Sequence, residues 1–153
     1  MTALRQARVR RAAEIARDPA LFDPDRALPR PLPPAGDYRC RTIKLGAQGG
    51  GMLDYVAYPS FTCRIAREDG TLRFTKLSGS QRPSGRLFAD GSARGVFLGT
   101  LALGEERRAM PYGRDAMRDM VGYVERIGER RWRLAFPSPT FEAMIEIVEL
   151  TPA

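Results

Sequence analysis

From Gly36 onwards, apolar and polar side chains alternate along the chain with a period of two. The alternation is clear near the C-terminus, where Trp132, Leu134 and Phe136 are separated by arginine and alanine. Successive side chains of a β-strand point to opposite faces of the sheet, so this period indicates strands with one face buried and one in water. Glycine, proline and aspartate interrupt the pattern at short intervals, which is typical of antiparallel strands joined by turns.

The alternation predicts eight strands, and turn sequences such as Glu68-Asp69-Gly70 predict hairpins between them. Eight consecutive strands with one buried face close most economically into an up-and-down barrel, because closure leaves no exposed edge. We therefore predict a mainly β fold, an antiparallel up-and-down barrel, with an open sheet or split sandwich as the alternative. The predicted strands are Asp37–Leu45, Tyr55–Arg67, Thr71–Leu77, Gly85–Phe88, Arg94–Leu103, Asp119–Ile127, Arg131–Phe136 and Thr140–Leu150.

The first 36 residues have a different composition. Thr2–Asp18 is predicted to form one helix whose thin apolar stripe packs outside the barrel, and Pro19 is expected to end it. Six of the twelve prolines, Pro19 among them, lie between Asp18 and Gly36, which favours an extended connector over residues 19–36. A proline-rich ligand for a partner domain is the alternative. The barrel domain is then expected to cover residues 37–153.

Missing residue types exclude most catalytic chemistry. The chain has no histidine, which removes Ser-His-Asp and Cys-His catalysis and His-rich metal sites. Two cysteines cannot supply the four thiolates of a structural zinc site, and neither a phosphate-binding loop motif nor a dinucleotide fingerprint is present. Paired carboxylates remain, but Glu142 and Glu146 fall on the polar phase of the last strand and are expected to face water. We predict no cofactor, no metal and no catalytic constellation.

The basic residues are almost all arginine: 23 of 25, with only Lys44 and Lys76 as lysine. The formal net charge is +7, but acidic residues are interleaved throughout. A nucleic-acid-binding protein gathers its basic groups into a stripe, so no nucleic-acid partner is predicted. No apolar run reaches the ~20 residues that a transmembrane helix needs.

The polar segment from Ser78 to Arg86 has two interpretations. Its glycines, serines and arginines could form an anion-binding loop, in which Arg82 or Arg86 faces a carboxylate or phosphate. Alternatively, it is a long solvated connection between strands, which is the more common structure for a cluster of glycine, serine and proline.

Cys40 and Cys63 lie on the first two predicted strands. If these strands pair, the thiols could reach the ~6 Å Cα separation of a disulfide. Two independent buried thiols are the alternative. A disulfide would imply an oxidising compartment.

Several phrases together resemble a bacterial family, domain of unknown function 4893, seen mainly in sphingomonad-type alphaproteobacteria. The resemblance spans nearly the whole chain, and no activity is established for the family. It implies an exported protein, with Cys40 and Cys63 at positions that suit a structural disulfide. We expect a periplasmic location if the true start carries a signal segment, and a cytoplasmic one if the chain as given is complete. The phrases are Phe22-Asp23-Pro24-Asp25-Arg26-Ala27-Leu28, Gly36-Asp37-Tyr38-Arg39-Cys40-Arg41, Ile43-Lys44-Leu45-Gly46, Asp54-Tyr55, Phe61-Thr62-Cys63, Lys76-Leu77-Ser78-Gly79-Ser80-Gln81-Arg82-Pro83, Phe97-Leu98-Gly99, Pro111-Tyr112-Gly113-Arg114-Asp115 and Glu125-Arg126-Ile127-Gly128.

These observations favour a non-enzymatic periplasmic barrel with the layout of the calycins, whose interior binds a small apolar or amphipathic ligand or is filled by its own side chains. A polar mouth would use Lys44, Lys76, Gln81 and Arg82 to orient a head group. An envelope-protein interaction module is the first alternative. A small hydrolase or isomerase with a buried, pKa-shifted lysine, a tyrosine or a carboxylate is the second. The candidate lining residues are Tyr38, Phe61, Phe74, Trp132, Leu134, Phe136 and Phe141.

Overall fold

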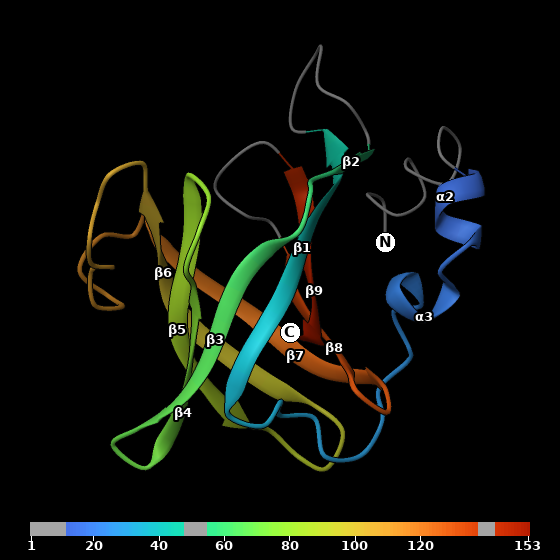
Figure 1. Ribbon diagram of the computed structural model, residues 1–153, viewed down its shortest axis with the longest axis horizontal. Coiled ribbons are helices and arrows are strands. Elements are labelled where there is room, and N and C mark those ends of the chain that lie inside the picture. Colours follow the sequence, from blue (N-terminus) through green and yellow to red (C-terminus); the bar gives the residue numbers. More distant parts are fainter. Residues whose placement is uncertain (1–11, 48–54, 138–142) are drawn as a thin grey trace.

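The computed structural model describes residues 12–47, 55–137 and 143–153. Eight strands pair with their neighbours in chain order, and the last pairs with the first, which closes an antiparallel barrel (Figure 1). This confirms the predicted barrel. A short ninth strand, β2, pairs only with β1. The strands are β1 (Gly36–Ala47), β2 (Tyr55–Ala57), β3 (Phe61–Glu68), β4 (Thr71–Lys76), β5 (Gln81–Ala89), β6 (Gly95–Leu103), β7 (Asp119–Gly128), β8 (Arg131–Pro137) and β9 (Ala143–Pro152).

Two strands differ from the sequence prediction. The predicted strand over residues 55–67 is divided into β2 and β3, which pair with different parts of β1. β5 begins at Gln81, so most of the expected loop from Ser78 to Arg86 is strand. Pro83 is tolerated there because the ladder with β4 ends at Ser84, which leaves Pro83 paired with β6 alone.

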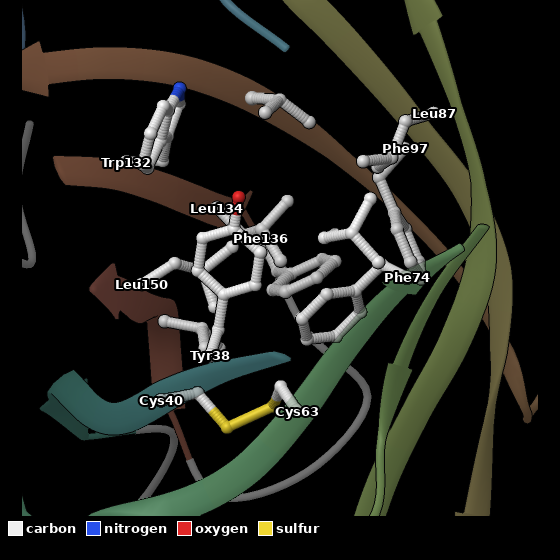
Figure 2. Packing of buried hydrophobic residues seen from close by; sticks show 13 residues of the cluster. Tyr38, Cys40, Cys63, Phe74, Leu87, Phe97, Trp132, Leu134, Phe136 and Leu150 are labelled. Atoms are coloured by element: carbon white, nitrogen blue, oxygen red, sulfur yellow. A yellow bond between two sulfur atoms is a disulfide. The ribbon is translucent and has the colours of Figure 1, made fainter. Parts of the chain in front are cut away.

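Aromatic side chains fill the interior of the barrel at the end where β1 begins (Figure 2). The ring of Phe97 lies edge-on to the rings of Phe74 and Phe136, with centroids 6.1 and 5.1 Å apart. Such edge-to-face pairs contribute about 0.5–1.5 kcal/mol each beyond the area they bury. Glycine makes room for these rings, since a β-carbon on Gly85 or Gly99 would lie 2.7 Å from the Phe97 ring.

Cys40 and Cys63 form a disulfide inside the barrel, with their Cα atoms 5.9 Å apart (Figure 2). The predicted pairing is therefore confirmed. The two residues are diagonal neighbours on β1 and β3, because Cys63 lies opposite Tyr38 and Cys40 lies opposite Phe61. The disulfide joins these two strands near the last residue pair of their ladder.

The connector covers one end of the barrel, which we call the lower end; the opposite end, beside β2, is the upper end (Figure 1). Leu32 packs against the aromatic cluster. A β-carbon on Gly95 would lie 2.6 Å from the Leu32 side chain. The Tyr38 hydroxyl donates a hydrogen bond of 2.6 Å to the carbonyl of Pro34. The lower end is thus closed by contacts with the proline-rich segment.

Two short helices, α2 (Ala12–Ala16) and α3 (Pro19–Phe22), lie against the outer wall. The helix predicted over Thr2–Asp18 ends at Ala16 in the structure, and its residues 2–11 lie outside the described residues. Pro19 then begins a separate helix, α3. The Asp18 side chain caps this helix by accepting from the Leu21 N–H, and proline suits the first helical turn because its missing N–H needs no partner there.

A second apolar cluster lies between these helices and the barrel. β9 therefore has both faces covered, and its predicted phase was wrong. Val148 and Leu150 belong to the interior cluster, and Glu146, expected in water, is buried on the same phase. The members of the outer cluster are Ile15, Leu21, Phe22, Ile43, Leu45, Ile127 and Ile147.

Candidate functional site

A cavity of about 220 Å³ lies at the upper end of the barrel. Its described wall combines two amines, one carboxylate, one amide, three hydroxyl groups and two aromatic rings. Most of these side chains occupy the inward phase of their strands, above the aromatic cluster. The lining residues are Thr42, Lys44, Tyr58, Phe61, Lys76, Ser80, Gln81 and Glu146.

The change of partner along β1 shapes this cavity. The β1–β3 ladder ends at the Cys40–Phe61 pair, and β2 pairs with β1 from Ile43 onwards. Between these ladders the Tyr58 N–H donates to the Thr42 carbonyl at 3.0 Å. This bond continues the pairing of β1 with the β2 segment by one residue, and Tyr58 lies in the cavity wall together with Phe61.

The disulfide lies directly beside the cavity. Cys63 is the cross-strand partner of Lys76 in the β3–β4 ladder, and Cys40 precedes Thr42 on the inward phase of β1. A covalent bond thus joins β1, which carries Lys44, to β3, the neighbour of the strand that carries Lys76. Side chains on such a rigid base keep their relative positions when a ligand binds.

Both lysines are buried, with Lys44 5% and Lys76 6% exposed. Lys44 Nζ donates a hydrogen bond of 2.9 Å to Gln81 Oε1 and lies 5.5 Å from the centre of the Tyr58 ring. Lys76 Nζ lies 4.5 Å from the centre of the Phe61 ring. Cations are attracted to aromatic faces at such distances, so the rings partly replace the water that the amines lose on burial.

The charges in the cavity act on one another. Burial lowers the pKa of Lys76, Glu146 raises it, and the positive charges of Lys44 and Arg82 lower it. Glu146 is 8% exposed and lies opposite Lys44 in the β1–β9 ladder. Two amines therefore share a small volume with one carboxylate, an arrangement that favours the entry of a second anion.

Four of the predicted ligand-binding residues line this cavity: Lys44, Phe61, Lys76 and Gln81. Arg82 is at the same end but has a different function. Its guanidinium donates to the carbonyls of Gly79, Gly104 and Glu106 at 2.7, 2.7 and 2.6 Å. It thereby ties the β4–β5 connection to the segment that follows β6.

The remaining predicted lining residues lie below the cavity. They are buried in the aromatic cluster and contact one another there, as Figure 2 shows. Phe141, a further candidate, lies outside the described residues. The residues in the cluster are Tyr38, Phe74, Trp132, Leu134 and Phe136.

Sequence reasoning missed Thr42, Tyr58, Ser80 and Glu146. Strand periodicity could have identified Thr42, because it continues the inward series of Tyr38, Cys40 and Lys44 at a period of two. Glu146 was assigned to the wrong face of β9, whose outer face is as apolar as its inner one. Tyr58 and Ser80 belong to connections, for which strand periodicity gives no direction.

A second depression, of about 350 Å³, lies on the outer wall beside α3. Its lining is mainly apolar and includes Phe22, Tyr123 and Ile147. Arg133 is buried beneath it, where the guanidinium bonds to Glu125 at 2.8 Å and to the carbonyls of α3 and the connector. Arg133 was predicted on a water-facing phase; the covering helix explains its burial.

Within the described ranges, no group of three or more histidine, cysteine, aspartate or glutamate residues is arranged to hold a metal ion. None of the helices in these ranges has the length and apolar run that a membrane crossing needs.

The model of one protein family, described as "Domain of unknown function (DUF4893)", matches residues 1–150. Comparisons with curated proteins and with solved structures find no significant match.

Proposed function

The chain belongs to the DUF4893 family of domains of unknown function, and we propose that it is a binding domain for a small amphipathic anion. The anion occupies the cavity at the upper end of the barrel. Its charged group contacts the amines of Lys44 and Lys76 and the amide of Gln81. Its apolar part lies against the rings of Phe61 and Tyr58.

The observation that carries this proposal is the burial of two lysines in the wall of one cavity. An amine taken out of water costs free energy unless partners compensate it. Among the described residues of the cavity wall, Glu146 is the only one with a carboxylate. A bound anion would supply the second negative charge, so the unliganded site pays a cost in stability that the ligand relieves.

The cavity volume limits the size of the ligand. An apolar cavity of about 150 Å³ accommodates one benzene molecule, and the cavity at the upper end measures about 220 Å³. This is room for a short organic acid or a single-ring carboxylate. A long acyl chain would have to displace the aromatic cluster below.

The contacts of the N-terminal segment give less support to an envelope-protein interaction module built on the helix and prolines. Pro31 and Pro33 are buried. Arg26 donates to the carbonyl of Ile127 at 2.5 Å, and Leu28 forms a bridge with Arg126. The connector therefore already has a partner, which is the barrel itself.

We further propose that the protein works in an oxidising compartment, the bacterial periplasm. The disulfide between Cys40 and Cys63 supports this, because such bonds persist mainly outside the cytoplasm. Rapid acid quenching and thiol alkylation of the natural host's cell fractions would test it. We expect the protein in the periplasmic fraction with unalkylated cysteines; protein in the cytoplasmic fraction with both thiols alkylated would contradict the proposal.

Thermal unfolding with a panel of short carboxylates tests the binding function. Benzoate or a similarly sized acid should raise the melting temperature, since a ligand at 100 times its Kd adds about 2.7 kcal/mol of stability. Lys44→Met should abolish the rise. Arg39→Met, which removes the same charge from an exposed position on β1, serves as the control and should respond like the wild type. An equal response of Lys44→Met would contradict the proposal.

A further inference from the structure

Lysine is the exception in this chain, because every other basic side chain is arginine. Both exceptions line the same cavity. Arginine supplies positive charge as well as lysine does, but only the lysine amine loses its proton readily on burial and can attack a carbonyl group. The distribution of the two residue types therefore indicates a site where an amine, and not merely a cation, is needed.

We infer that Lys76 captures a small 2-oxo acid as a reversible Schiff base, while Lys44 and Gln81 hold the carboxylate of the same molecule. The inference rests on the proposed anion-binding function and specifies its ligand class. Such a molecule carries an anionic group and an electrophilic carbon on neighbouring atoms. A 2-oxo acid therefore matches a cavity in which one amine binds the carboxylate and a second amine lies close to the electrophilic carbon.

The position of Lys76 suits a nucleophile. Its amine lies in the cavity wall, 4.5 Å from the centre of the Phe61 ring. Gly79 leaves space beside it, since a β-carbon there would lie 3.5 Å from Nζ. The backbone of Lys76 belongs to β4, opposite the disulfide-bonded Cys63, so the base of the side chain is fixed.

The electrostatic surroundings favour the reactive form of the amine. Burial lowers the pKa of Lys76, and the charges of Lys44 and Arg82 act in the same direction, against the opposing effect of Glu146. A larger fraction of this amine is therefore neutral near pH 7 than of a solvent-exposed lysine. Desolvation and a neighbouring cation are the two usual means by which proteins activate a Schiff-base lysine.

The chemical step needs no oxidant or reductant. The neutral amine adds to the carbonyl carbon, a C–N bond forms, and the carbonyl π electrons move to oxygen. The Glu146 carboxylate in the cavity wall takes one proton from the nitrogen of this adduct and returns it to the oxygen, which gives the neutral carbinolamine. A proton from solvent then converts the hydroxyl group to water, its departure leaves the iminium, and hydrolysis reverses every step.

Reductive trapping tests the inference on the full chain with its disulfide intact. The protein is incubated with pyruvate and sodium cyanoborohydride, and adducts are located by intact-mass measurement and peptide mapping. We expect one adduct per chain, on Lys76. Lys44→Met should raise the pyruvate concentration for half-labelling about tenfold, the effect of losing one charged hydrogen bond. Arg39→Met should label like the wild type.

Adducts divided equally between Lys44, Lys76 and the N-terminal amine would overturn the inference, as would the absence of any adduct. The wild-type peptide map assigns the site by itself, so the conclusion does not depend on whether Lys76→Met folds.

L-Lactate separates the two proposals, because it has the size and charge of pyruvate but no carbonyl carbon to attack. Stabilisation by lactate without a pyruvate adduct would overturn covalent capture and leave anion binding intact. Neither stabilisation nor adduct would contradict both.

Discussion

The two ends of the barrel differ in what their inward side chains do. On β1, Tyr38 and Cys40 of the lower part are followed by Thr42 and Lys44 of the upper part. On β4, Phe74 is followed by Lys76. Each of these strands changes from apolar to polar without changing its period.

β5 and β9 show the same change at the same level. Leu87 lies below and Gln81 above on β5, while Val148 lies below and Glu146 above on β9. The disulfide lies near this boundary. The comparison teaches that one closed sheet can separate stability from binding along its axis: the lower interior supplies the packing free energy, and the upper interior tolerates buried charge.

Truncation in the lower end should have the largest effect. Phe97 is fully buried between Phe74 and Phe136. We expect Phe97→Ala to lower the free energy of unfolding by about 3–5 kcal/mol, because it removes a packed ring and leaves a cavity. Urea denaturation measures the change. A loss below about 1 kcal/mol would show that the lower interior is not tightly packed.

The disulfide at the boundary should rank second. Its cysteines lie 23 positions apart in the sequence, and closing a loop of such length is worth about 3 kcal/mol in the chain-entropy model. The double variant Cys40→Ala and Cys63→Ala should lose about that much in chemical denaturation. It should also weaken anion binding, because β1 and β3 diverge directly above. Unchanged affinity would mean that the cavity does not depend on the crosslink.

Much of this organisation follows from the sequence. The strand positions and the closed barrel follow from a period of two with turn residues between the strands. The same period placed Cys40 and Cys63 on neighbouring strands, where a disulfide was one of two alternatives. The period of two also pointed Lys44, Lys76 and Gln81 into the barrel, and they were predicted to lie together at its polar mouth. Periodicity did not fix the direction of Glu146, because a strand with apolar residues on both faces has two equally good phases. The outer face of β9 is covered by α2 and α3. These helices are short, and their apolar pattern is too weak to predict that they cover it.

The upper end should respond to truncation in the opposite direction. Replacing a whole buried ion pair with apolar residues of similar volume is often neutral or stabilising. Lys76→Met removes the surplus amine and leaves Lys44 opposite Glu146, so no buried charge loses its counter-charge. We expect Lys76→Met to raise the free energy of unfolding by about 1 kcal/mol at pH 7 and to abolish pyruvate capture. Denaturation without ligand, paired with trapping, checks both. A large loss of stability would contradict the division between the two ends.

The smallest expected effect is the pH dependence of the difference in unfolding free energy between the wild type and Lys76→Met. The pKa of Lys76 is lowered by folding, so the unfolded chain binds more protons between the folded pKa and the ordinary value of 10.5. The destabilisation is thus complete below the folded pKa and disappears as pH rises towards 10.5. The charged and titratable groups around the amine are Lys44 on β1, Arg82 on β5, Glu146 on β9 and Tyr58 in the β2–β3 connection. The wild type and the Lys76→Met variant both contain them, so they do not contribute to the difference.

Unfolding of wild type and Lys76→Met should therefore be compared across this pH range. The wild type should approach the stability of the variant as pH increases. A difference that stays constant would show that the Lys76 amine titrates as it does in the unfolded chain.

A crystal structure of the protein soaked with 4-bromobenzoate tests the central claim most directly, since bromine is located by its anomalous scattering. We expect one bromine position in the cavity at the upper end, beside Phe61, with the carboxylate contacting Lys44 and Lys76. Bromine only in the outer depression beside α3, or none at saturating concentration, would contradict the assignment of the upper end as the binding site.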